Sequence, residues 1–290
     1  MIYRRPRSNV RGMGYQLEPD IRAHYGVGLE GSRLDTWGRL EAIRTRELLD
    51  RYLPAAPATV YDIGGAEGPY ALPLARAGYT VHLLDPVPPH VAAARGASAA
   101  QPDAPLASAE VGDARELPYA DASADAVLLL GPLYHLIERA DRLRALTEAR
   151  RVLRPGGVLL VAAISRFASM VDGLTVGMIG DPAFEAIVAG ALSDGVHRNP
   201  DPVGRPEWFT LAYFHHPDEL REEVLAGGFA DVAVLAVEGV ARSVDPAALD
   251  DPARLAATLR VLRRVEREPA LLGASPHLIA VATAPLPDPR

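Results

Sequence analysis

The segment from Val60 to Tyr70 constrains the fold more than any other part of this chain. It reads VYDIGGAEGPY, in which a short β-type run carrying Asp62 is followed at once by a glycine-dense turn. An apolar helical pattern begins directly afterwards, at Ala71. Glycines permit a sharp turn and the close approach of a ligand, and the first N–H groups of a helix point back into such a turn. The segment therefore predicts a strand–turn–helix unit of a parallel sheet, with a ligand site at the turn.

The spacing of small residues in this turn separates two ligand classes. A pyrophosphate cofactor favours G-x-G-x-x-G, whereas here Gly64, Ala66 and Gly68 occupy alternate positions and Pro69 removes one N–H donor. The turn resembles instead the D-x-G-x-G-x-G turn of class I S-adenosylmethionine-dependent methyltransferases. Its one departure from that pattern is Ala66, which stands where the family has its middle glycine. A tight turn that binds no ligand is the alternative.

Apolar runs alternate with helical patterns along the rest of the chain. Strands are expected over residues 60–63, 79–84, 109–111, 126–130, 158–163, 231–237 and 277–284. Strands that are apolar throughout and separated by helices indicate a parallel sheet covered on both faces. Together with the resemblance, this predicts an α/β fold with a Rossmann-like, doubly wound, seven-stranded and mostly parallel sheet. The last strand is expected to be antiparallel.

The same patterns divide the chain into segments. We expect a flexible tail over residues 1–20 and a single methyltransferase domain over 21–290. Within that domain we expect a helical cap over residues 21–55 and a cofactor-binding core over 56–165. An inserted lid is expected over 166–214, where the hydrophobic periodicity of helices and strands is lost, and the C-terminal part of the sheet over 215–290.

Composition narrows the classes of partner. The net charge is −7, which argues against a nucleic acid as the main partner. Cysteine is absent, so a disulfide framework and a thiolate nucleophile are excluded. No apolar run reaches the length of a membrane span, and the arginine-rich start lacks a following apolar region typical of a secretory signal. We expect a cytoplasmic protein with a small-molecule partner and no membrane partner, and a homodimer is left open.

Two aspartates follow the glycine turn at informative positions. Asp85 comes about twenty residues after Gly64, at the end of the second expected strand, where a carboxylate can accept from ribose hydroxyls. Gly112-Asp113-Ala114 follows the third strand. In the family that it resembles, this aspartate accepts from the adenine amino group and the next amide meets a ring nitrogen. Helix capping by either aspartate is the alternative.

The resemblance implies S-adenosyl-L-methionine as the cofactor. It also implies a binding site made of Asp62, Gly64, Gly65, Ala66, Asp85, Pro86, Gly112, Asp113, Ala114 and Gly131. In relatives with a similar tyrosine and arginine in the cap, these side chains meet the methionine carboxylate, and Tyr25 and Arg33 are the counterparts here. A guanidinium suits this role because its fork binds a carboxylate bidentately. A solvated arginine and a packing tyrosine are the alternatives.

The loop after the fourth strand, Gly131-Pro132-Leu133-Tyr134-His135, lies where this family presents side chains to the transferred methyl group. His135 is therefore the candidate base, and Tyr134 the candidate wall of the substrate pocket. Tyr213 and His215 are expected to contact substrate near the lid, with packing in the core as the alternative. The histidines of the lid region lack a metal-binding spacing, so no metal is expected.

These observations predict a methyltransferase that acts on a small molecule by in-line displacement. The nucleophile is left open between oxygen, nitrogen and carbon. The Asn-Pro-Pro-Tyr sequence typical of amino-directed nucleic-acid or glutamine methylation is absent after the fourth strand. One alternative is a repurposed or non-catalytic protein that binds S-adenosylmethionine. The other is a nicotinamide-dependent oxidoreductase, although the chain has no lysine for a Tyr-x-x-x-Lys pair.

Overall fold

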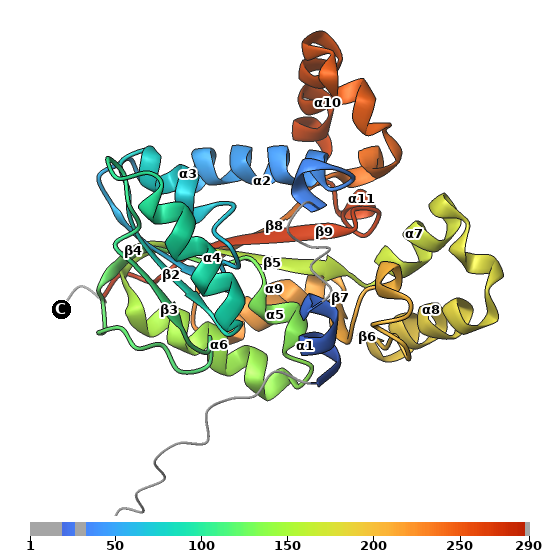
Figure 1. Ribbon diagram of the computed structural model, residues 1–290, viewed down its shortest axis with the longest axis horizontal. Coiled ribbons are helices and arrows are strands. Elements are labelled where there is room, and N and C mark those ends of the chain that lie inside the picture. Colours follow the sequence, from blue (N-terminus) through green and yellow to red (C-terminus); the bar gives the residue numbers. More distant parts are fainter. Residues whose placement is uncertain (1–18, 27–32, 288–290) are drawn as a thin grey trace, which may run out of the picture.

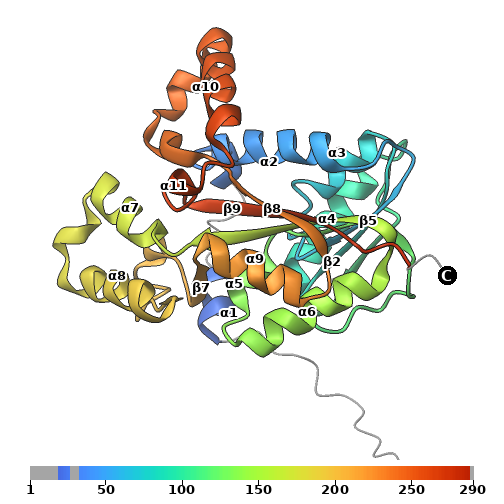
Figure 2. The ribbon, with the colours of Figure 1, turned by 180° about the vertical axis from the view of Figure 1, so that it is seen from behind.

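The computed structural model describes residues 19–26 and 33–287. The expected tail over residues 1–20 falls almost wholly outside this range, and its last two residues begin α1 (Pro19–Gly26). The expected cap continues in α2 (Arg39–Tyr52), after a short 3₁₀ turn that contains Arg33. Figures 1 and 2 show α1 near the end of the central sheet, and the ring of its His24 lies 5.3 Å from that of Phe209 in the lid.

The central sheet carries the seven strands that the sequence predicts. They are β1 (Thr59–Ile63), β2 (Thr80–Asp85), β3 (Ser108–Val111), β4 (Ala124–Leu129), β5 (Leu153–Ser165), β8 (Ala230–Ala236) and β9 (His277–Thr283). The order runs β3-β2-β1-β4-β5 with parallel pairing throughout. β9 then pairs with β5 and with β8, antiparallel to both. The expected Rossmann-like sheet with an antiparallel last strand is confirmed.

In the described part of the chain, two short strands extend the predicted seven to a sheet of nine. The two additional strands, β6 (Val196–His197) and β7 (Ala212–His215), lie in the lid. β7 pairs with the last two residues of β5, and β6 pairs with β7. Strands this short carry no periodic pattern of their own, because their pairing depends on contacts distant in the sequence.

Helices cover both faces of the sheet. α2, α3 (Ala71–Arg76) and α4 (Pro88–Ala99) pack on one face, where their side chains meet alternate strand residues such as Val60. α6 (Arg139–Val152) and α9 (Pro217–Ala226) pack on the other face, against residues such as Ile63. Figure 1 shows α2 and α3 above the sheet and α6 and α9 below it. This two-sided burial explains why the central strands are mostly apolar, whereas the edge strand β3 is largely exposed.

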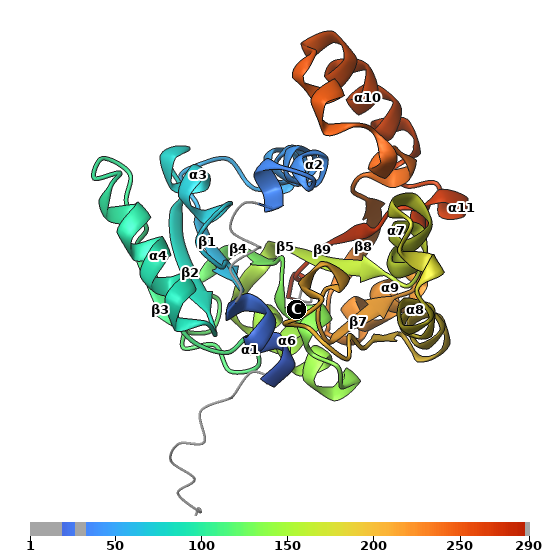
Figure 3. The same cartoon turned by 45° about the vertical axis from the view of Figure 1, so that its right-hand side comes forward.

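The lid extends beyond the carboxyl end of β5, as Figure 3 also shows. It consists of β6 and β7 together with α7 (Ala168–Val176), η2 (Met178–Gly180), α8 (Pro182–Asp194) and η3 (Pro206–Trp208). A second excursion stands away from the sheet between β8 and β9 (Figure 1). It contains η4 (Gly239–Ser243), η5 (Pro246–Asp250), α10 (Pro252–Val265) and α11 (Pro269–Leu272). None of the described helices combines the length and apolarity needed to cross a membrane.

A buried ion pair joins the core to the base of the lid. Arg142 of α6 is 2% exposed and donates from Nε and Nη2 to both carboxylate oxygens of Glu223 of α9, at 2.9 and 2.8 Å. Its guanidinium lies 3.7 Å from the ring centroid of Tyr213 in β7. Burial alone would raise the pKa of Glu223, but His215 and Arg142 outweigh it and lower that pKa to about 2.

We predict that Arg142→Met destabilises the protein by about 3–5 kcal/mol, because it removes the buried guanidinium from the buried Glu223 carboxylate and leaves it the exposed Arg139 at 3.6 Å. Arg142→Met combined with Glu223→Met should recover a large part of this loss. The free energy of unfolding in urea at neutral pH measures both effects. The control is Arg198→Met, which breaks an exposed pair with Asp194 and should change stability by about 1 kcal/mol or less. Equal losses for Arg142→Met and the control would contradict the prediction.

Candidate functional site

The glycine turn packs closely against the loop that follows β4. Gly64 has a φ of +74°, and a Cβ atom at this position would lie 2.6 Å from Cδ of Pro132. A Cβ on Gly112 would lie 2.6 Å from the side chain of Leu84. Neither glycine can be replaced without moving a neighbour. The small residues therefore let three loops converge at the carboxyl edge of the sheet.

Asp85 links the end of β2 to this turn. Its carboxylate is buried and accepts hydrogen bonds from the amides of Ala66 and Val87, both at 2.9 Å, and from Nδ1 of His90 at 3.2 Å. Asp85 does not cap α4, whose N-cap residue is Val87. These contacts fix the orientation of the carboxylate at the place where the sequence predicts a ribose-binding acid.

Asp62 is a second buried acid beneath the turn. Neither of its carboxylate oxygens makes a hydrogen bond of normal geometry, although the amide of Ala71 is close enough to favour the charged form. Burial raises the pKa of Asp62, and the negative charge of Asp85 raises it further, to about 7. The side chain is therefore divided between its charged and neutral forms near neutral pH.

Asp113 follows β3 and is held by its own loop. Its carboxylate accepts from the Arg115 amide at 2.8 Å and from the Arg115 guanidinium, with Nη2 at 2.8 Å. No helix begins at Arg115 in the described part of the chain, so Asp113 does not cap a helix. Arg115 also donates to Asp141 of α6, which fixes the loop against the sheet.

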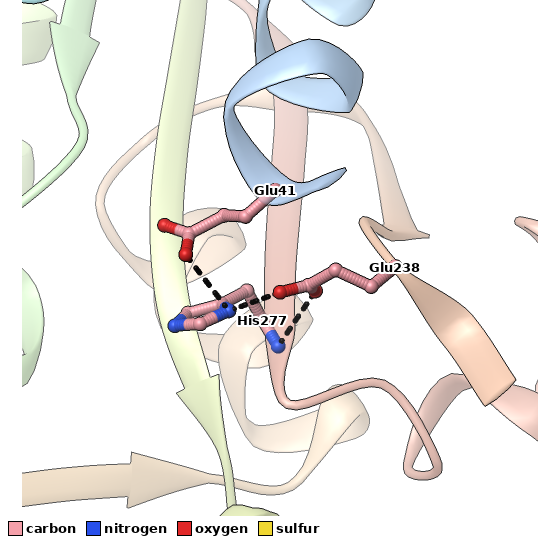
Figure 4. A group of neighbouring side chains, drawn as sticks. All are labelled: Glu41, Glu238 and His277. Carbon is pink, nitrogen blue, oxygen red and sulfur yellow. Dashed lines mark hydrogen bonds and ion pairs between the residues drawn. The ribbon is translucent and has the colours of Figure 1, made fainter. Parts of the chain in front are cut away.

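An ion-pair network closes the site on the side of the cap (Figure 4). Arg33 donates bidentately to Glu41, with Nη2 2.9 Å from Oε1. His277 donates from Nδ1 to Glu238 at 2.6 Å, and the same atom lies 3.5 Å from Glu41. Burial alone would lower the pKa of His277, but Glu238 and Glu41 outweigh it and raise the pKa to about 9.

Glu41, Glu238 and His277 lie close enough together to suggest a metal site. The charges account for the cluster without one, because two carboxylates face one guanidinium and one imidazolium. We therefore interpret the cluster as a charge-balanced network that anchors α2 to the ends of β8 and β9.

One cavity of about 1000 Å³ runs from the glycine turn to the lid. Among the predicted site residues, those that line it are Arg33, Asp62, Gly64, Gly65, Ala66, Asp85, Pro86, Gly112, Asp113, Ala114, Gly131, Tyr134 and His135. Tyr25 falls in α1, but its side chain lies outside the described part of the structure. The fold thus brings most of the predicted site residues to one cavity.

Tyr213 and His215 do not line the cavity, which corrects the expectation that they contact substrate. Successive side chains of a strand point to opposite faces, and in β7 it is Phe214 that lines the cavity. The rings of Tyr213 and His215 lie 4.7 Å apart on the other face, next to Arg142 and Glu223. Burial lowers the pKa of His215 in that cluster.

Several lining residues of the lid were not predicted. Ser169 of α7, His197, Trp208 and Phe209 lie in a region without clear helical or strand periodicity, and of these only His197 was considered from the sequence, as a metal ligand or, in preference, a substrate contact. Nδ1 of His197 is 2.7 Å from the Ser169 hydroxyl, and Nε2 is 2.6 Å from the carbonyl oxygen of Trp208. Since a carbonyl only accepts, Nε2 donates and Nδ1 accepts. Burial lowers the pKa of His197 to about 4, so the ring is neutral.

Comparison with known proteins agrees with this geometry. Residues 61–161 match the family model described as a methyltransferase domain. This part of the chain is thus similar to a methyltransferase domain. The resemblance to class I S-adenosylmethionine-dependent methyltransferases is thereby confirmed, and S-adenosyl-L-methionine is the cofactor of that family.

Curated relatives match the methyltransferase domain over part of their length. An uncharacterised methyltransferase of Mycobacterium tuberculosis is 36% identical over 129 residues, which cover 44% of this chain and 49% of the relative. The methyltransferase GfsG of Streptomyces halstedii is 32% identical over 142 residues, which cover 49% of this chain and 50% of the relative. The chain thus spans about half the length of the curated relatives that it matches.

Solved structures extend the likeness over most of the chain. A SAM-dependent methyltransferase of Methanosarcina mazei superposes with a TM-score of 0.55 at 18% identity, covering 83% of this chain and 98% of that one. A SAM-dependent methyltransferase of Thermotoga maritima superposes with a TM-score of 0.56 at 17% identity, covering 91% of this chain and 98% of that one. At these identities the likeness shows the fold of the methyltransferase domain and the elements around it.

We predict that Asp62 makes stability depend on pH. Its pKa is raised in the folded protein, which therefore binds this proton more tightly than the unfolded chain does, and stability falls as pH rises from about 4 to about 7. Asp62→Asn carries no titrating proton and should lack this fall. Between about pH 4 and pH 8, the wild type should lose up to roughly 4 kcal/mol more than the variant.

Urea unfolding of both proteins at the two pH values measures the difference. Asp103→Asn, which changes an exposed acid outside the cavity, is the matched control and should follow the wild type. The same pH slope in wild type and Asp62→Asn would show that Asp62 does not hold a raised pKa.

Proposed function

We propose that this protein transfers a methyl group from S-adenosylmethionine to a small-molecule acceptor by in-line displacement. The observation that carries the proposal is the single cavity of about 1000 Å³ that joins the glycine turn, Asp85 and Asp113 to the lid. Ligand sites usually measure about 300–1,000 Å³, so this cavity has room for an acceptor beside a nucleoside cofactor.

The residues present suit the nucleoside part of this cofactor. Asp85 accepts from two amides and from His90, and its remaining lone pair is available to a ribose hydroxyl. Asp113 and the amide of Ala114 would meet the adenine edge. A Cβ atom on Gly65 would lie 2.8 Å from an Asp62 oxygen, so this position needs glycine for the turn to pass over the acid.

The methionine part carries both charges of an amino acid. The Arg33–Glu41 pair lines the cavity and offers both complementary charges. We therefore assign the carboxylate of the methionine part to Arg33 and its ammonium group to Glu41. The internal Arg33–Glu41 ion pair would then be replaced by two ion pairs with the ligand. Tyr25 remains a predicted contact of the carboxylate.

The chain itself has little chemistry to perform. When bound, S-adenosylmethionine supplies a methyl group already activated by its positive sulfur, so the acceptor's lone pair forms the new bond while the C–S electrons return to sulfur. The walls of the cavity hold the acceptor in line and exclude water. His135 lines the cavity after β4 and would take the proton that the acceptor loses, either from a hydroxyl nucleophile or from an ammonium group that must become the free amine before it attacks.

A small-molecule acceptor is supported by the enclosed lid and by the net charge of −7. One relative is the 27-O-demethylrifamycin SV methyltransferase of Amycolatopsis mediterranei, 52% identical over 50 residues, which cover 17% of each chain. That relative is named for a small-molecule acceptor. A cytoplasmic location, a homodimer and the absence of a nucleic-acid partner remain predictions.

A repurposed protein of this fold is the second candidate. The [4+2]-cyclase SpnF superposes with a TM-score of 0.52 at 20% identity, covering 85% of this chain and 82% of that one. The same fold is therefore also found in a protein named as a cyclase. An oxidoreductase is disfavoured, because Ala66 and Pro69 spoil the spacing that a diphosphate needs.

Calorimetry with S-adenosylmethionine, S-adenosylhomocysteine and NAD tests the proposal. We expect binding of the first two and none of NAD. Asp85→Asn should weaken S-adenosylhomocysteine binding about 10- to 100-fold, because it removes a charge-assisted hydrogen bond to the ribose. The control is Asp103→Asn, which lies outside the cavity. Binding of NAD alone, or unchanged affinity in Asp85→Asn, would contradict the assignment.

His135→Ala should lower turnover about 10²- to 10⁴-fold, with any acceptor that a methyl-release screen of metabolites identifies. Its affinity for S-adenosylhomocysteine should stay close to that of the wild type. His82→Gln is the matched control, because this histidine lies on β2 outside the cavity. Unchanged turnover in His135→Ala would remove His135 from the mechanism. Cofactor binding without methyl release from any acceptor would favour the repurposed protein.

A further inference from the structure

Phe209 of the lid has a backbone conformation that is almost confined to glycine. Its φ is 65° and its ψ is −156°. A side chain is strained in this region, and such strain persists only where the surrounding structure enforces it. The position therefore calls for an explanation, because an ordinary loop could relax.

Two buried polar side chains enforce this conformation. Nδ2 of Asn199 donates to the carbonyl oxygen of Phe209 at 2.7 Å and to that of Arg205 at 2.9 Å. His197 donates to the carbonyl oxygen of Trp208 at 2.6 Å, and its ring is held from the other side by Ser169. Asn199 and His197 are 4% and 3% exposed. Two successive carbonyl groups are thus fixed from the interior of the lid.

The ring of Phe209 consequently stands in the cavity next to the proposed base. Its centroid lies 6.0 Å from that of His135 and 6.4 Å from that of Tyr134. His24 of α1 meets it edge-on at 5.3 Å. The fixed ring therefore links the lid, α1 and the loop after β4 at the place where an acceptor would meet the methyl group.

The charges of the lining restrict what this half of the cavity can hold. Among the described lining residues, the cations are Arg33, Arg46 and the protonated His277, all on the side of the cap. The charged side chains that the lid contributes are the carboxylates of Asp172, which has an interaction partner within the protein, and Glu207, which is more than half exposed and pairs with Arg205. Among the described lining residues of the lid, an anionic acceptor would meet no cation in return for its lost water, whereas an apolar face would gain from contact with the aromatic wall.

We infer that Phe209 is a specificity-determining residue, a fixed aromatic platform for an uncharged, hydroxyl-bearing acceptor with a flat apolar face. The acceptor rests on this ring with its hydroxyl group directed to His135. The inference rests on the proposed function and narrows its acceptor class. Asn199 and His197 are positioning residues, since they act through the backbone of Phe209.

Three probes with one aromatic body separate the charge classes. They are 2-naphthol, 6-hydroxy-2-naphthoate and 2-(2-naphthyl)ethylammonium, titrated by their fluorescence into protein saturated with S-adenosylhomocysteine. We expect 2-naphthol to bind, and the naphthoate to bind about tenfold or more weakly, because its carboxylate is desolvated without a partner. The ammonium probe should bind no more tightly than 2-naphthol.

Variants of Phe209 distinguish the contribution of its aromatic ring to 2-naphthol binding from that of its apolar volume. Phe209→Leu should weaken 2-naphthol binding about 3- to 10-fold, since it keeps an apolar side chain but removes the aromatic face. Phe209→Tyr retains the ring and should restore the affinity. Val203→Ala is the control, because Val203 is an exposed apolar residue of the same lid outside the cavity. All variants should bind S-adenosylhomocysteine like the wild type.

Four outcomes would overturn the inference. They are equal 2-naphthol affinity in Phe209→Leu and wild type, naphthoate binding as tight as that of 2-naphthol, tighter binding of the ammonium probe, and no 2-naphthol binding to protein that holds S-adenosylhomocysteine. Failure of the proposed function is distinct, because it is seen as the absence of S-adenosylhomocysteine binding itself. The probe titration, repeated without that ligand, then still tests the platform.

Discussion

The hydrogen bond from the Ala66 amide to the Asp85 carboxylate is the contact on which the geometry of the site depends. It joins the turn after β1 to the end of β2, at the carboxyl edge where loops of a parallel sheet converge. A buried carboxylate needs donors, and the turn needs an acceptor for an N–H group outside the helical ladder. Each therefore satisfies the other, and both remain directed toward the cavity.

The core of this arrangement was predictable because its signals are local. Most of the seven strands are buried on both faces and appear in the sequence as apolar runs, whereas the edge strand β3 is largely exposed. Asp85 and Asp113 follow two of those runs directly, and the topology of a parallel sheet places them at one edge. The prediction of most cavity-lining residues near the turn follows from the same topology.

The lid was not predictable in the same way, because its structure depends on contacts distant in the sequence. β7 exists through pairing with the end of β5, and nothing in Ala212–His215 indicates which residues face the cavity. A shift of one residue exchanges Phe214 for Tyr213 and His215. The sequence likewise does not show that Arg142, from a helix far away in the chain, packs against the other face of this strand.

Residues with a strained backbone conformation lie at both ends of the cavity. Four described non-glycine residues have a positive φ, and two of them, Ala66 and Phe209, line the cavity. Ala66 is held by the Asp85 carboxylate and Phe209 by Asn199, so in both cases a buried polar side chain maintains a conformation that the residue alone would avoid. At the turn, this arrangement fixes the orientation of the Ala66 amide and the Asp85 carboxylate. At the lid, it fixes the orientation of the Phe209 ring in the cavity. The two ends of one cavity thus use the same physical device for two different kinds of contact, a polar one for a nucleoside and an apolar one for its reaction partner.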